Sequence, residues 1–170
     1  MECGRSRVED ERIVGGRAAR EGEFPYLASI QKYGSHVCGG IIISRDTMLT
    51  AAHCVRRRNV TDLQQKLGMR VEAGKTDLRK NATHSQSRRV KSIISHEKFG
   101  TNGMRNDIAL LKLQEPFDLE DSEGYVAPIC LPDPEQSSSL RGNIIVSGWG
   151  ATREGGHGSD TMWMVEVVFF

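Results

Sequence analysis

The sequence predicts an all-β protein, and two observations lead to that prediction. The apolar residues occur in short runs whose length suits strands, and no apolar pattern at helical spacing continues beyond a turn or two. Glycine, proline, asparagine and aspartate separate these runs at regular intervals, as they do at the turns of a barrel or sandwich. Of the 170 residues, 38% are hydrophobic and 26% are charged, which is a composition that can build a folded core.

The segments expected to form strands fall into two groups. The first group consists of Tyr26–Gln31, Val37–Ser44, Thr47–Ala51, Met69–Ala73, Val90–Ser95 and Ile108–Leu113, and the second consists of Ile144–Ser147 and Met162–Phe170. A short helical turn is expected at Ala51–Val55. The polar, Pro- and Ser-rich stretch 114–143 between the groups predicts a connecting strap. Because two strands do not make a stable sheet, we expect the second group to be incomplete and its strands to stay unpaired.

The overall charge is close to zero, so it creates no strong electrostatic field that would attract nucleic acid or a membrane. There are 23 basic and 22 acidic residues, and the net charge is +1. Two local basic runs, Arg56–Arg58 and Arg88–Arg89, leave a heparin-type binding module open as an alternative. The favoured interpretation of these runs is solvated charge on loops and strand edges, so neither nucleic acid nor a membrane is expected as a partner.

The four cysteines and two glycosylation motifs indicate an oxidising compartment. No two cysteines form a close C-x-x-C pair, which argues against a zinc site, and no metal or cofactor is expected. Asn59 and Asn81 each begin an N-x-T sequon, which favours glycosylation and secretion. No apolar signal-peptide core follows Met1, so we expect the natural chain to begin upstream, and further domains there are possible.

His53 and Asp107 indicate a function only when the residues around them are also considered. Alone, His53 could be an ordinary histidine and Asp107 a turn residue. With their surroundings they resemble the trypsin/chymotrypsin family of serine proteases, and the likeness covers nearly the whole chain. The motifs that carry it are Arg12-Ile13-Val14-Gly15-Gly16, Phe24-Pro25-Tyr26, Cys38-Gly39-Gly40, Thr50-Ala51-Ala52-His53-Cys54, Asn106-Asp107-Ile108-Ala109-Leu110-Leu111, Pro128-Ile129-Cys130-Leu131-Pro132 and Ser147-Gly148-Trp149-Gly150.

The resemblance implies a fold and a catalytic role for each of the two residues. It implies the first six-stranded barrel of a two-barrel fold, followed by the first strands of an incomplete second barrel. His53 matches the general base that takes a proton from a serine hydroxyl and returns it to the leaving amine. Asp107 matches the carboxylate that orients the imidazole and stabilises its cation. Protein substrates are the expected partners in the parent enzyme.

The resemblance also implies an activation site and a disulfide pattern. Cleavage between Arg12 and Ile13 would free an ammonium group at Ile13, and the basic residue implies an activating protease of trypsin-like specificity. Cys38 would pair with Cys54 beside the histidine. Cys3 would pair with Cys130 and tether the leader after cleavage.

No nucleophile is recognisable in the sequence. In this family the serine follows the aspartate by roughly 90 residues, which corresponds to about position 200. Neither Gly-Asp-Ser-Gly-Gly nor G-x-S-x-G occurs in the sequence. The resemblance therefore predicts a leader at 1–12, the first barrel at 13–117, the strap at 118–143 and a partial second barrel at 144–170.

We therefore expect the N-terminal portion of a secreted serine endopeptidase zymogen that is inactive as this truncated chain. The alternative is a non-catalytic product that acts as a decoy for the activating protease or binds a separate second barrel. A decoy would be cut after Arg12 and would slow the activation of an intact zymogen, which distinguishes it from an inert product.

Overall fold

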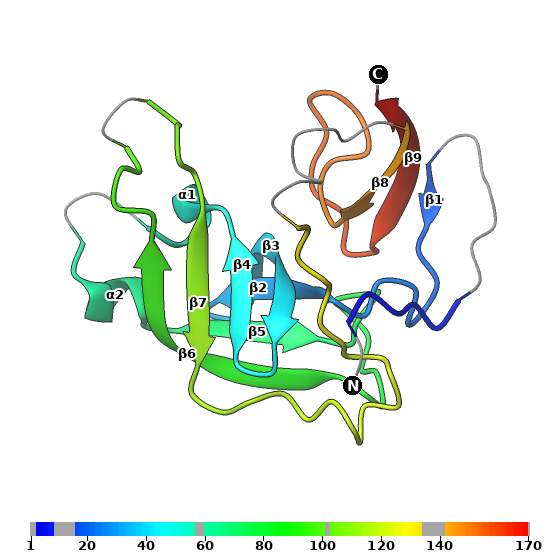
Figure 1. Cartoon of the computed structure of the whole chain (residues 1–170), viewed down its shortest axis with the longest axis horizontal. Helices are drawn as coiled ribbons and strands as arrows, with labels where there is room; N and C mark the ends of the chain where they lie inside the picture. Colours follow the sequence, from blue (N-terminus) through cyan, green and yellow to red (C-terminus); the bar gives the residue numbers. More distant parts are fainter. Residues whose placement is uncertain (1–2, 9–15, 57–59, 101–102, 134–141, 170) are drawn as a thin grey trace.

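The structure is a computed structural model, and it describes residues 3–8, 16–56, 60–100, 103–133 and 142–169. Its strands form a closed barrel and a smaller three-stranded sheet beside it (Figure 1). The all-β prediction is therefore confirmed, together with the six-stranded barrel that the resemblance implies.

The barrel is antiparallel and closes in the order β2, β3, β4, β7, β6, β5. Its bounds are β2 (Leu27–Lys32), β3 (Ser35–Ser44), β4 (Thr47–Thr50), β5 (Met69–Ala73), β6 (Gln86–Ser95) and β7 (Ala109–Leu113). Each strand matches a predicted segment, and the largest displacement is at β6, which begins at Gln86 rather than Val90. Register shifts interrupt the ladders at Ile30/Gln31, Ile42/Ser44 and Val90/Ser92, where bulges bend the strands round the closed sheet.

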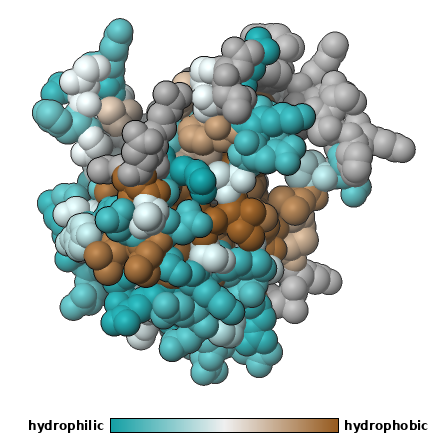
Figure 2. Space-filling model, turned by 90° about the vertical axis from the view of Figure 1, so that its left-hand side faces the viewer, coloured by the Kyte–Doolittle hydropathy of each residue, from teal (hydrophilic) through white to brown (hydrophobic). Residues whose placement is uncertain are grey.

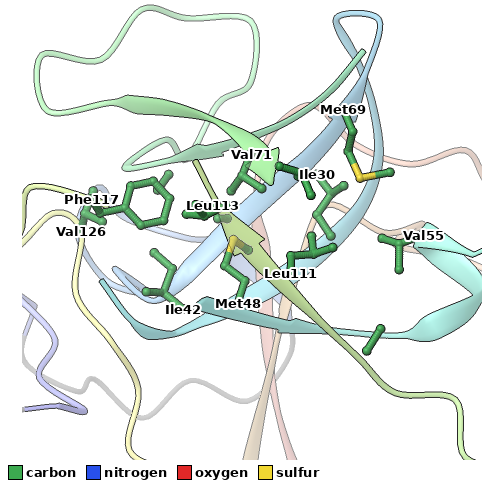
Figure 3. Close-up of a cluster of buried hydrophobic side chains, with 14 of the residues drawn as sticks. Ile30, Ile42, Met48, Val55, Met69, Val71, Leu111, Leu113, Phe117 and Val126 are labelled. Carbon is green, nitrogen blue, oxygen red and sulfur yellow. The ribbon is translucent and has the colours of Figure 1, made fainter. Parts of the chain in front are cut away.

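The barrel interior is filled by apolar side chains from alternate positions of its strands. In β7, Ala109, Leu111 and Leu113 are buried while Leu110 and Lys112 are less so, which is the two-residue period of a strand. Figure 3 shows these inward-pointing side chains converging from several strands. The labelled strand residues are Ile30, Ile42, Met48, Met69, Val71, Leu111 and Leu113, and the core also contains Val55 from the helix that follows β4 and Phe117 and Val126 from the segment after β7.

Two short helices follow β4. The first, α1 (Ala52–Val55), agrees with the expected helical turn and buries Ala52 and Val55 against the barrel core. The second, α2 (Asp62–Lys66), was not predicted. It begins with a capping box, because the Thr61 side chain accepts from the Gln64 N–H and the Gln64 side chain accepts from the Thr61 N–H.

The smaller sheet has the order β1 (Arg17–Ala18), β9 (Trp163–Phe169), β8 (Gly142–Gly148). The expectation that the last two strands stay unpaired is wrong, since β8 and β9 pair along their whole length from Gly142↔Phe169 to Gly148↔Trp163. The third strand, β1, comes from the other end of the chain and lies antiparallel to β9. This pairing places Arg17 and Ala18 in the second sheet, although the sequence assigned them to the first barrel.

A second core fixes the small sheet against the barrel. Met162 and Met164 are buried with Trp149, Phe24 and Ala19. The Trp149 indole N–H donates to the Thr76 carbonyl at 3.1 Å, and the Met162 N–H donates to the same carbonyl at 2.8 Å. The opposite face of β9 is more open, with Trp163 38% exposed. On another face of the molecule, apolar surface forms a band bordered by hydrophilic side chains (Figure 2).

The described part of the N-terminal leader is held at several points. The predicted disulfide between Cys3 and Cys130 is present, and the Gly4 N–H donates to the Pro128 carbonyl at 2.9 Å. Further along, the Arg7 guanidinium lies 4.3 Å from the centre of the Tyr125 ring. The leader therefore remains attached to the strap by covalent and non-covalent contacts.

Candidate catalytic site

Strand pairing places His53 and Asp107 at the same end of the barrel. The register of β4 with β7 sets Thr50 opposite Ala109. His53 follows Thr50 in α1, and Asp107 precedes Ala109 by two positions. Since the strands are antiparallel, the chain leaves β4 where it enters β7, and the two residues meet just beyond the ladder.

Local contacts hold each residue in this position. The Thr50 hydroxyl donates to the Gly39 carbonyl at 2.8 Å and ties the end of β4 to β3. Asn106 adopts a left-handed conformation with φ 58°, which asparagine tolerates better than most residues. This turn directs Asp107 towards α1.

Asp107 contacts His53 through both of its carboxylate oxygens. Oδ2 lies 2.6 Å from His53 Nδ1, and Oδ1 accepts the His53 backbone N–H at 2.8 Å. The aspartate side chain is 21% exposed and the histidine side chain 51%. The carboxylate thus lies behind the imidazole while the ring faces solvent.

The contact determines the protonation pattern of the pair. The hydrogen bond from the His53 side chain, followed by that from its backbone N–H, lowers the pKa of Asp107 from its ordinary value. An ionised carboxylate only accepts hydrogen bonds, so Nδ1 carries the proton that it shares with Oδ2. In neutral His53 the lone pair is therefore on Nε2, where a general base needs it.

The predicted disulfide Cys38–Cys54 lies directly beside the imidazole and joins β3 to α1. Cys54 Sγ is 3.5 Å from His53 Nε2. This sulfur–imidazole contact was not predicted, and its only signal in the sequence is that Cys54 follows His53.

The structure describes only some of the other predicted site residues. Arg12, Ile13 and Asn59 fall outside the described residues. Asn81 is exposed in an irregular segment before β6, and its glycosylation stays a prediction. Among the described residues, no helix is long and apolar enough to cross a membrane.

Comparisons with known proteins agree with the geometry. A model of the Trypsin family matches residues 13–170. Trypsin-1 of Astacus astacus is 39% identical over an alignment of 159 residues, and the match covers 91% of this chain and 64% of that protein. Ovochymase-2 of Mus musculus is 35% identical over 165 residues, which cover 91% of this chain and 26% of that protein.

A human relative, Transmembrane protease serine 11B, is 35% identical over 153 residues, or 87% of this chain and 34% of that protein. The chain thus spans less than two thirds of the length of each of these relatives. Because the family match covers nearly all of the sequence and the barrel is the one expected, the chain belongs to the Trypsin family of serine proteases.

Proposed function

We propose that this chain supplies the general base, His53, and its orienting carboxylate, Asp107, to a serine endopeptidase. The single observation that carries the proposal is the double contact of Asp107 with the ring and the backbone N–H of His53. The carboxylate fixes the tautomer that leaves Nε2 free to accept a proton, and it stabilises the imidazolium that follows. Family membership makes peptide bonds the expected substrate.

In the proposed mechanism His53 Nε2 takes the proton of a serine hydroxyl as that oxygen attacks the peptide carbonyl. The imidazolium then gives this proton to the leaving amine, and a water molecule later repeats the sequence to release the acyl group. Asp107 keeps its negative charge throughout and remains hydrogen-bonded to Nδ1.

The 170-residue polypeptide is proposed to have no peptidase activity of its own. The sequence contains no Gly-Asp-Ser-Gly-Gly segment and no G-x-S-x-G motif. Without a nucleophile, the base has no hydroxyl to activate. A fluorophosphonate probe is expected to leave the purified chain unlabelled under conditions that label Trypsin-1 of Astacus astacus. Labelling at the mass of this chain would disprove the proposed inactivity.

The role of Asp107 as the carboxylate that orients His53 is tested in a chimera. Residues 13–167 are joined to the part of Trypsin-1 that follows its matched region, and the product is assayed with a peptide substrate. In an active chimera, Asp107→Asn is expected to lower kcat by about 10⁴-fold because the wrong tautomer is favoured. His157→Ala, at an exposed residue outside the site, is the matched control. Equal activity of the Asp107→Asn and control variants would refute the assignment.

We further propose that the chain is of zymogen type, secreted, and activated by cleavage between Arg12 and Ile13. The sequence Arg12-Ile13-Val14-Gly15-Gly16 supports the cleavage site, and the disulfide Cys3–Cys130 supports a leader that stays attached afterwards. The proposed partners are an activating protease of trypsin-like specificity and protein substrates, and domains upstream of Cys3 are part of this proposal.

A further inference from the structure

The imidazole of His53 and the two sulfurs of Cys38 and Cys54 gather at one point on the surface of the barrel. One donor atom from each of these residues lies within 4.8 Å of the others. The sulfurs form a disulfide, and it is the thiolate rather than the disulfide that binds metals. In this oxidised state only His53 offers a strong ligand.

We propose that reduction of the Cys38–Cys54 disulfide creates a Zn²⁺ site. Its ligands are the two thiolates and His53 Nε2, with a water molecule in the fourth position. A dithiol reductant cleaves the S–S bond, gives two electrons and two protons to the cysteines, and becomes a cyclic disulfide. Each cysteine thiol then releases its proton when zinc binds, while His53 binds through its Nε2 lone pair and releases none.

The present spacing suits tetrahedral zinc. Bonds of about 2.3 Å to sulfur and about 2.0–2.1 Å to nitrogen place a sulfur and a nitrogen roughly 3.5 Å apart, and two sulfurs roughly 3.8 Å apart. Cys54 Sγ and His53 Nε2 are already 3.5 Å apart. The Cα atoms of Cys38 and Cys54 are 6.0 Å apart, so side-chain rotation is sufficient to separate the sulfurs once their bond is broken.

Asp107 prepares the histidine for this role. Its Oδ2 lies 2.6 Å from Nδ1, so the proton is on Nδ1 and the lone pair is on Nε2, the nitrogen that lies 3.5 Å from Cys54 Sγ. A carboxylate behind a ligating histidine is the usual second partner in zinc sites. His53 is also half-exposed, which gives the ion and its water access.

The donor set selects the metal. Two thiolates and one imidazole suit zinc, whereas Ca²⁺ and Mg²⁺ require oxygen ligands. The absence of a C-x-x-C pair from the sequence argued against zinc, but β3 and α1 bring the two cysteines together in space. Zinc on Nε2 would also occupy the lone pair that the proposed general base needs. This inference does not depend on peptidase activity.

The test uses the whole chain, reduced with a dithiol and then freed of the reductant without air. Zn²⁺ is titrated against a chromophoric chelator, and Co²⁺ is used as a spectroscopic substitute. We expect one Zn²⁺ per reduced chain, thiolate-to-cobalt charge-transfer absorption, and no comparable binding by the oxidised chain. A Cys3→Ser/Cys130→Ser variant is expected to bind as the wild type does, because those cysteines lie elsewhere.

Variants separate this site from adventitious binding. His53→Gln is expected to weaken zinc binding at least ~10-fold, and Asp107→Asn ~10–100-fold through the loss of its support. His157→Gln is the matched control and should bind as the wild type does. Equal loss in His53→Gln and His157→Gln, equal affinity of the oxidised chain, or loss of β structure by circular dichroism in the zinc-loaded reduced chain would each overturn the proposal.

Discussion

Asp107 receives both the ring Nδ1–H and the backbone N–H of His53, one on each carboxylate oxygen, at 2.6 and 2.8 Å. The backbone contact fixes the distance between the β4–α1 connection and the start of β7, and the ring contact fixes the orientation of the imidazole. Structure and protonation are therefore coupled, because the hydrogen bonds that join the two segments also hold the carboxylate in its charged form.

The first prediction concerns the titration of Asp107. Carbon-13 NMR of its carboxyl group is expected to give a pKa below the ordinary value of 3.8. In the His53→Ala variant this pKa should rise, but only partly, because the backbone N–H of residue 53 remains. Because the pKa of Asp107 is lower in the folded state than in the unfolded state, the ionised carboxylate stabilises the fold at pH values above the unfolded pKa. This stabilisation is lost as the pH falls through the folded pKa. His157→Ala is the control, and an equal rise of the Asp107 pKa in both variants would contradict the prediction.

The second prediction concerns the leader. Limited trypsin digestion is expected to create a new N-terminus at Ile13 while the leader stays bound through the Cys3–Cys130 disulfide. Non-reducing electrophoresis should show one species, and reduction should release the leader. The variant Cys3→Ser cannot form this disulfide, so it should release the leader without reduction. Release of the leader from the unreduced wild-type chain would exclude the tether.

The barrel was predictable from the sequence, but some elements outside it were not. β5 alternates apolar and polar residues, and β7 is a short, mostly apolar run; both patterns indicate a strand. The helix α2 was missed although Thr61 and Gln64 form a recognisable capping box. Five residues provide too little apolar periodicity to indicate a helix.

Long-range pairing explains part of the main error. β1 has only two residues, Arg17 and Ala18, and neither has a pattern of its own. Its partner β9 comes from the other end of the chain, so no local signal could show that β1 pairs with β9. The pairing of β8 with β9 joins two neighbouring predicted strands, and the expectation that they stay unpaired overlooked it. The disulfides and the His53–Asp107 pair were predicted through family resemblance. The contact of Cys54 Sγ with Nε2 depends on side-chain orientation, which the sequence does not specify.

The third prediction concerns the ion pair that links β1 to the turn after it. Glu23 accepts hydrogen bonds from the Arg17 guanidinium and, at 2.8 Å, from the Arg20 backbone N–H. The side chains of Arg17 and Glu23 are 17% and 6% exposed. Arg17→Ala leaves a buried carboxylate without its main partner, so a loss of about 3–5 kcal/mol in the free energy of unfolding is expected at neutral pH.

Urea unfolding of a matched variant provides the control. Arg56 and Asp62 form an exposed pair at 3.5 Å, and Arg56→Ala should cost no more than about 1 kcal/mol. The hydrogen bond from Arg17 lowers the pKa of Glu23, so the stabilisation exists above the unfolded pKa and disappears as pH falls through the folded one. The difference in the free energy of unfolding between the wild type and Arg17→Ala should therefore become smaller at acidic pH. A difference that stays constant between pH 7 and pH 3 would contradict this cause.

The fourth prediction concerns Gly74, which follows β5 and has a φ of +74°. A Cβ atom there would lie 2.7 Å from the His84 backbone carbonyl oxygen and 3.2 Å from Val126 Cγ2. Gly103 has a similar φ of +70°, but nothing lies within 4 Å of its added Cβ. Both alanine variants incur the left-handed penalty of about 1–2 kcal/mol.

The comparison of these two glycines isolates the steric cost of a single methyl group. Because backbone atoms cannot rotate away from it, Gly74→Ala should lose roughly 1–3 kcal/mol more than Gly103→Ala in the free energy of unfolding. Urea unfolding of the two variants and the wild type measures this difference. Equal losses would mean that the segment around His84 moves aside without cost. In that case the close packing of the β5 end against the strap would not contribute to the stability of the barrel.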